Sequence, residues 1–212
     1  MTAANRHTDG VDERFDGEIC GFGTASGHRM VIGYWPSSPF GSFADVMHEE
    51  PDGARVLRAP TEQVAEFVSE TYSFTRVDVV PVDVDRTPGR LAVAAGDLWA
   101  EVAIGRRSAL GQVLRRVPSR VAGAPWWCAV QDPVARVLLR GGRTRGSAGN
   151  GRREWYGARD QHRLESVRAT LSGADLGPLA DVWPPVQFGF SSTPRTPSIV
   201  RVTTTIRRAP AG

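Results

Sequence analysis

The most informative absence in this chain of 212 residues is lysine, because all 26 basic residues are arginine. Without lysine the protein has no Schiff-base nucleophile, no lysine general base and no lysine for a phosphate-binding P-loop. Coding in a GC-rich genome explains the bias, since arginine codons are rich in GC and lysine codons in AT. The exclusion of these chemistries holds whatever the origin of the bias.

Cysteine is scarce as well. Cys20 and Cys128 lie far apart and form neither a metal-ligand pair nor a redox motif, which indicates reduced thiols. Residues Met1–Phe15 lack the apolar segment of a secretory signal, and no run approaches the roughly 18 apolar residues that span a bilayer. We therefore expect a cytoplasmic protein without a membrane partner.

Histidine motifs are missing too. The 4 histidines form no HExxH pattern or Cys/His cluster, and no serine lies in a G-x-S-x-G elbow, so we expect neither a metal nor a cofactor. Two candidates for acid–base catalysis remain: His48, and His162 with Asp160 on the same predicted strand face. Hydrogen-bonded structural histidines are the plainer interpretation of both.

What the chain does contain is a succession of short alternating segments. Period-two alternation of apolar and polar residues predicts strands at 15–23, 28–35, 42–50, 54–58, 76–85, 90–95, 97–104, 153–159, 163–171, 186–190 and 199–206. Helical spacing of apolar residues predicts helices from Thr61, at 108–117 and at 119–139, the last kinked by prolines.

This pattern favours an α+β protein of mostly antiparallel β structure, with a curled sheet forming a barrel or sandwich and two or three helices packed on one face or end. Strands and helices do not alternate as in βαβ units, which excludes a Rossmann-type fold. We expect residues 15–206 to form a single globular domain, with a disordered leader at 1–14 and a frayed tail at 207–212.

Charge is divided unevenly along the chain. Residues 1–104 carry 8 Arg against 17 acidic residues, whereas residues 105–212 carry 18 Arg against 6. The basic half contains a stretch rich in arginine and glycine, 140–160, which can bind anions through guanidinium forks and glycine backbone amides. The same composition is typical of a flexible, solvated connection. The candidate ligand-binding residues are Arg143, Arg145, Arg152, Arg153, Trp155, Tyr156 and Arg159.

Three segments together resemble an uncharacterised family of conserved hypothetical proteins from high-GC actinobacteria: Gly33–Met47 (GYWPSSPFGSFADVM), Gly149–Gly157 (GNGRREWYG) and Pro185–Arg195 (PVQFGFSSTPR). No activity is assigned to that family, so the resemblance implies a cytosolic bacterial protein and transfers no catalytic residue. The segment Ser38–Asp45 is also similar to a P-x-G-x-[YF] segment of acetoacetate-decarboxylase-like barrels. The chemistry of that family needs a Schiff-base lysine, so only the barrel could be shared.

These observations leave three hypotheses about function. The first is a small-molecule-binding barrel or sandwich whose site, near Arg143–His162, takes a small aromatic or anionic ligand. The second is a metal-independent enzyme that uses a histidine–carboxylate pair as acid and base. The third is a nucleic-acid or protein interaction module that uses the arginine–glycine stretch, with nucleic acid disfavoured because no RNP or helix-turn-helix pattern occurs. A homodimer is possible in each case.

Overall fold

The computed structural model describes residues 12–117, 145–148, 152–186, 188 and 193–207. Thirteen strands of this part form one sheet, and all their pairings are antiparallel except that of β4 with β5. The predicted fold class, mostly antiparallel β with a curled sheet and few helices, is confirmed. The elements are β1 Asp12–Thr24, β2 Arg29–Ser37, β3 Phe43–Glu49, β4 Arg55–Ala59, α1 Glu62–Ser69, β5 Arg76–Val79, β6 Val82–Thr87, β7 Arg90–Ala95, β8 Leu98–Arg107, α2 Ala109–Leu114, β9 Arg145–Ala148, β10 Arg152–Leu171, β11 Ala174–Asp175, β12 Leu179–Ala180 and β13 Ser198–Arg207.

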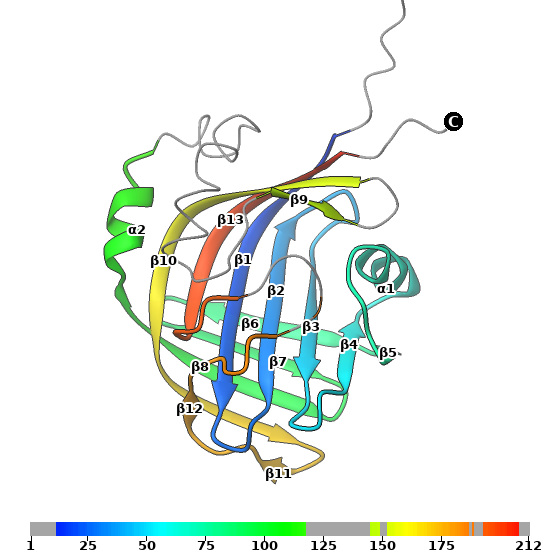
Figure 1. Cartoon of the computed structure of the whole chain (residues 1–212), viewed down its shortest axis with the longest axis vertical. Helices are drawn as coiled ribbons and strands as arrows, with labels where there is room; N and C mark the ends of the chain where they lie inside the picture. The colour runs from blue at the N-terminus through cyan, green and yellow to red at the C-terminus, as the bar shows by residue number, and fades with distance from the viewer. Residues whose placement is uncertain (1–11, 118–144, 149–151, 187, 189–192, 208–212) are drawn as a thin grey trace, which may run out of the picture.

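The sheet bends strongly on itself. Its strands follow the order β5-β4-β3-β2-β1-β13-β10-β8-β7-β6, so four strands separate β1 from β6. Nevertheless Arg86 of β6 forms an ion pair with Glu18 of β1, because the curl brings the β6 edge round to face β1. Figure 1 shows β6, β7 and β8 crossing behind the long strands β10, β13, β1, β2 and β3. The result is a half-barrel.

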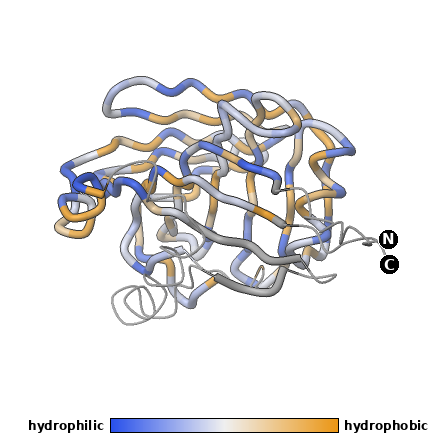
Figure 2. Tube along the Cα trace, turned by 90° about the horizontal axis from the view of Figure 1, so that it is seen from above, coloured by the Kyte–Doolittle hydropathy of each residue, from blue (hydrophilic) through white to orange (hydrophobic). Residues whose placement is uncertain are grey.

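The concave face of the half-barrel holds the main core. On β1 the alternate residues Cys20 and Phe22 point into it, and Ile199 of β13 lies beside Cys20. Figure 2 shows the matching alternation of hydrophilic and hydrophobic residues along the strands. The core side chains are fully or nearly fully buried, so the hydrophobic effect holds the two halves of the curl together. They include Met30, Ile32, Val46, Leu91, Val93, Leu98, Val102, Leu164, Val167 and Leu176.

Helix α1 covers part of the convex face. Thr61, where the helix was predicted to begin, caps it by accepting a hydrogen bond from the Val64 amide at 3.2 Å, and Glu62 lies in the first turn. Its buried residues Val64, Phe67 and Val68 pack against Phe15 and Leu57 of the sheet. A second convex cluster joins Val31 to Val182, Val186 and Phe188. Both faces of the sheet therefore carry packed apolar residues.

Several boundaries differ from those predicted. Strand β1 begins at Asp12, inside the expected leader, while residues 1–11 and 208–212 lie outside the described part. The expected strand 76–85 is split around Pro81 into β5 and β6, because proline cannot donate to a strand ladder. Val186 and Phe188 belong to no strand but fill the convex cluster.

The described part contains two helices, and neither is long and apolar enough to cross a bilayer. Helix α2 occupies the first part of the segment predicted to be helical at 108–117. The predicted helix 119–139 and Cys128 lie outside the described residues. Cys20, by contrast, is a free and fully buried thiol, as expected for a reduced cysteine, and burial raises its pKa.

Candidate functional site

A cleft of about 400 Å³ opens on the concave side of the sheet, above the apolar core. A volume of this size is within the range of small-molecule sites. Five strands and one turn supply the wall of the cleft. Most side chains of this wall are polar, whereas the rest of the concave face is apolar. The lining residues are Glu18, Arg86, Pro88, Gly89, Ile104, Gly105, Asp160, His162, Ile199 and Arg201.

Strand register explains why the polar residues gather. On β13, Ile199 and Arg201 are two residues apart and so point to the same face. Arg201 lies opposite Glu18 of β1 on one side and Asp160 of β10 on the other. His162 lies opposite Ile199. On each of the three neighbouring strands β1, β13 and β10, the concave face thus changes from an apolar residue to a charged or polar one over two positions.

One wall of the cleft is an ion pair between Glu18 and Arg86. The two guanidinium nitrogens Nε and Nη2 of Arg86 donate to the Glu18 carboxylate at 2.6 and 3.2 Å. The two side chains are about one-fifth exposed, at 22% and 23%, so the pair is partly shielded from solvent. This fork holds β6 against β1 and neutralises the Glu18 charge.

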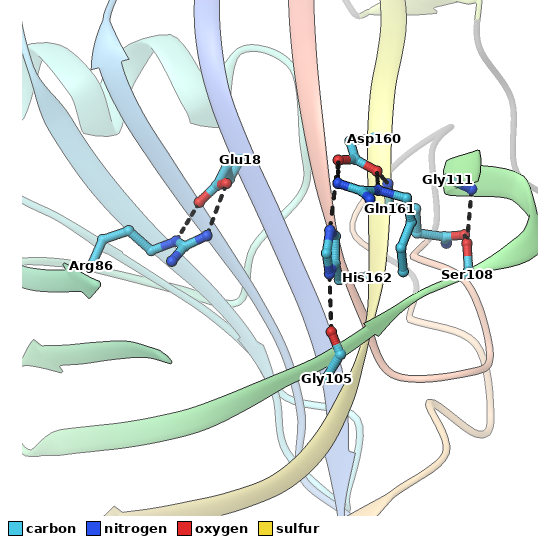
Figure 3. A network of polar contacts seen from close by, with 9 residues as sticks. Glu18, Arg86, Gly105, Ser108, Gly111, Asp160, Gln161 and His162 are labelled. Atoms are coloured by element: carbon cyan, nitrogen blue, oxygen red, sulfur yellow. Dashed lines mark hydrogen bonds and ion pairs between the residues drawn. The ribbon is translucent and has the colours of Figure 1, made fainter. Parts of the chain in front are cut away.

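The opposite wall is built on Asp160 (Figure 3). Arg107 of β8 donates from Nε and Nη2 to the two Asp160 oxygens at 2.7 and 2.9 Å, and the Gln161 amide donates at 2.8 Å. Burial raises the pKa of Asp160, but these hydrogen bonds and the Arg107 charge outweigh burial and hold that pKa below its usual value. Asp160 is therefore an anion whose charge is already compensated.

His162 stands between Asp160 and the backbone of β8. Its Nδ1 lies 2.9 Å from the carbonyl oxygen of Gly105, and its Nε2 lies 3.6 Å from Asp160 Oδ2. A carbonyl can only accept, so Nδ1 carries the proton and donates it to Gly105. In the neutral ring the lone pair of Nε2 then faces the Asp160 carboxylate. This arrangement makes Nε2 the nitrogen that can take a proton.

Helix α2 supports this wall from behind. Ser108, its N-cap, accepts a hydrogen bond from the Gly111 amide at 3.0 Å and donates to Gln161 Oε1 at 2.7 Å (Figure 3). Gly111 lies against β10 so closely that a Cβ there would be 2.3 Å from the Gln161 carbonyl oxygen. Gln161 is the residue between Asp160 and His162, so the helix fixes the strand at the site.

Among the described residues, Arg201 is the cation of the cleft wall that lacks a counter-ion. Within the described part of the chain it makes no ion pair and no hydrogen bond through its side chain, and it is exposed. Its two cross-strand neighbours, Glu18 and Asp160, are each bound to another arginine. Among the described residues, the cleft therefore offers one uncommitted positive charge, and the same cleft is lined by His162 and by the apolar side chains of Ile104 and Ile199.

The structure brings together only part of the predicted site. Asp160 and His162 share one face, as predicted, and line the cleft. Arg159 lies at the neighbouring bulge, where it is 3.6 Å from Asp16 and 3.5 Å from the Thr203 hydroxyl. His48 instead belongs to a separate buried cluster, in which its Nε2 is 2.7 Å from Nδ1 of His28.

The arginine–glycine stretch is partly a hairpin. Arg145 lies on β9 and pairs with Trp155 of β10, while Arg152 pairs with Ala148, so residues 145–148 and 152–155 are strands. Of the predicted ligand-binding residues, Arg143 lies outside the described part. For five others the structure describes the backbone but not the side chain: Arg145, Arg152, Arg153, Trp155 and Tyr156.

Sequence reasoning missed Glu18, Arg86, Arg107 and Arg201. Glu18 offered a signal, because it alternates with Cys20 and Phe22 and so places a charge on an otherwise apolar strand face. The three arginines offered no such signal in the sequence, since their roles depend on how the sheet curls. Among the described residues no group of three or more His, Cys, Asp or Glu side chains could hold a metal ion.

Comparison with known proteins gives two structural likenesses. Acetoacetate decarboxylase from Legionella pneumophila superposes with a TM-score of 0.45 at 9% identity, over 98% of this chain and 89% of that one. A protein named ATTH from Nitrosomonas europaea superposes with a TM-score of 0.31 at 11% identity, over 100% of this chain but 57% of that one. No family model and no curated protein matches the sequence.

Proposed function

We propose that this protein is a small-molecule-binding half-barrel that holds an anionic ligand in the cleft between Glu18–Arg86 and Asp160–His162. The observation that carries the proposal is Arg201, which lines the cleft and has no counter-ion among the described residues. Guanidinium groups bind carboxylates and phosphates through paired hydrogen bonds. Ile104 and Ile199 supply an apolar surface for the uncharged part of the ligand.

The charges around the cleft also limit the ligand. Glu18 and Asp160 are neutralised by Arg86 and Arg107, which leaves one net positive charge from Arg201. A ligand with several negative charges would meet two carboxylates and one free cation, so a singly charged anion fits best. Benzoate, which combines a carboxylate with an aromatic ring, is a suitable first probe.

The proposal is tested by calorimetric titration of the purified protein with benzoate and with sulfate. We expect saturable binding to the native protein and a loss of at least about tenfold in affinity for Arg201→Gln, because the variant removes a charged hydrogen bond donor. Arg163→Gln is the matched control, since Arg163 is exposed and points to the opposite face of β10. If neither anion binds, or if both variants bind equally well, the proposal is wrong.

A metal-independent enzyme that uses His162 and Asp160 is the second candidate. It is favoured by their presence in the same cleft as Arg201, where a bound anion would lie beside a nitrogen that can accept a proton. A bound compound that is also consumed, and whose consumption stops in His162→Gln, would establish it. The interaction-module hypothesis, the cytoplasmic location and the homodimer stay predictions.

A further inference from the structure

The contacts of His162 are complete only when its ring carries two protons. The Gly105 carbonyl at 2.9 Å requires a proton on Nδ1, because two acceptors cannot share that distance favourably. Once Nδ1 is protonated, neutral Nε2 turns its lone pair toward Asp160 Oδ2 at 3.6 Å, which is repulsive. A proton on Nε2 converts this contact into an attractive ion pair. The geometry around the ring therefore suits the imidazolium form.

One charge in the cleft wall, that of Arg201, opposes that form while the cleft is empty. Asp160 favours the imidazolium, but the charge of Asp160 is shared with Arg107, and the charge of Glu18 is shared with Arg86. Arg201 has no counter-ion among the described residues, and its positive charge in the same wall repels a second one. Among the described residues, the charged groups that line the cleft or lie against Asp160 and Gly105 come from β1, β6, β8, β10 and β13. They are Glu18, Arg86, Arg107, Asp160, Glu165 and Arg201.

We propose that the cleft takes up its anion together with one proton, which is bound at Nε2 of His162. The inference rests on the proposed function, because it requires that an anion binds at Arg201. The bound anion neutralises Arg201 and adds a negative charge near the ring, so both changes favour the imidazolium. The proton comes from the solvent or its buffer, a new N–H bond forms at Nε2, and Asp160 pairs with the resulting cation.

Thermodynamic linkage makes the effect reciprocal. If anion binding draws a proton onto His162, acidification must strengthen anion binding by the same coupling. One linked proton changes the affinity by at most about tenfold per pH unit. The half-barrel would then act as a site for a weak acid, taken up as anion plus proton.

The test is calorimetric titration with benzoate and with sulfate near pH 7, in two buffers of different ionisation enthalpy. Neither probe changes its own charge there, so a difference in observed heat reports the protons taken up by the protein. We expect uptake of up to one proton per anion in the native protein and in the Arg163→Gln control. His162→Gln should still bind the anion through Arg201 but with no uptake and a flat dependence on pH.

The possible outcomes separate the two proposals. If the anion binds with no proton uptake, or if uptake persists in His162→Gln, the linkage is wrong and the binding site stands. If no anion binds, the proposed function fails and the linkage fails with it. Should His162→Gln not fold, the ¹⁵N chemical shifts of the imidazole in the native protein decide instead, because only the linkage predicts that anion addition protonates Nε2.

Discussion

At the scale of single residues, Asp45 is the described carboxylate whose pKa is raised most by burial. It lies on β3 at 4% exposure, and its hydrogen bond comes from Trp35 Nε1 at 3.1 Å. The two side chains meet over Gly33, where a Cβ would lie 2.5 Å from Asp45 Oδ1. Burial raises the pKa of Asp45 to about 7, although the Trp35 hydrogen bond lowers it. The carboxyl is thus protonated in the folded protein at mildly acidic pH and charged above it.

We expect Asp45→Asn to stabilise the protein at alkaline pH. The pKa rise from 3.8 to about 7 means that ionised Asp45 costs up to roughly 4 kcal/mol of folding free energy above pH 7. Asparagine keeps an acceptor for Trp35 and removes the buried charge. Urea unfolding at about pH 8.5 should show a higher free energy of unfolding for this variant, by roughly 1–4 kcal/mol.

The matched control for that prediction is Asp83→Asn on β6, because Asp83 is exposed. Its effect on the free energy of unfolding should stay within about 0.5 kcal/mol at the same pH. An Asp45→Asn variant that is less stable than the native protein at alkaline pH would falsify the assignment of a buried, costly charge.

At the scale of elements, the seat of α2 on β10 decides the shape of the site. Gly111→Ala would force a Cβ to within 2.3 Å of a backbone oxygen, which a strand cannot move aside easily. We expect a loss of about 1–3 kcal/mol in stability from this clash, despite the gain of about 1 kcal/mol that alanine brings to a helix. Because Gln161 connects Asp160 to His162, benzoate affinity should fall as well.

Val113→Ala provides the comparison within the same helix. Val113 is 59% exposed, so its truncation leaves the contact with β10 intact and should change neither stability nor affinity appreciably. Chemical denaturation and benzoate titration of the two variants measure both effects. Equal behaviour of Gly111→Ala and Val113→Ala would mean that α2 does not position the site.

Strand β10 also shows what the sequence could and could not predict. Alternation predicted two strands, 153–159 and 163–171, but the structure has one strand over Arg152–Leu171. Its register shifts between Ala158 and Asp160 on the β13 side, and again on either side of Leu164 on the β8 side. Each bulge breaks the period of two without ending the strand, and bulges re-aim side chains beside sites.

The same reasoning applies to the site. Asp160 and His162 were predicted together because they are two residues apart on one strand, a local relation that the sequence contains. Arg86 and Arg201 meet them only through strand pairing over long sequence separations and through the curl that brings β6 to β1. Alternation identifies the face on which a residue lies but not its neighbours across the sheet, so these contacts could not be predicted.

At the scale of the whole molecule, the end of the half-barrel away from the cleft is fastened by a polar cluster built on two buried side chains, those of Arg58 and His48. Arg58 of β4 is 1% exposed and forms an ion pair at 3.0 Å with Asp97, in the turn between β7 and β8. Nη1 of Arg58 lies 3.4 Å from Nδ1 of His48. Arginine can only donate, so His48 accepts at Nδ1, and its Nε2 proton goes to His28.

This chain of donors holds both imidazoles neutral. Burial lowers the pKa of His48 to about 3, helped by the charge of Arg58 and by the repulsion that a protonated His28 would add, and burial also lowers the pKa of His28. Both pKa values lie below 6.5, the value that histidine has in an unfolded chain, so unfolding takes up protons at acidic pH. Stability from the pair is complete above about pH 6.5 and is lost as the pH falls toward 3.

Asp45 acts in the opposite direction within the same window, because its folded pKa of about 7 lies above the value of 3.8 in an unfolded chain. Its contribution to stability therefore grows as the pH falls from about 7 to 4.

The native protein should lose stability only gradually between about pH 6.5 and 4.5, while Asp45→Asn, which lacks the compensation, should lose up to about 1.4 kcal/mol more per pH unit. His48→Gln, which offers an acceptor to Arg58 and a donor to His28, should lose less than the native protein. Urea unfolding of the three proteins across this range measures the slopes, and parallel slopes would show that the two buried groups do not titrate against each other.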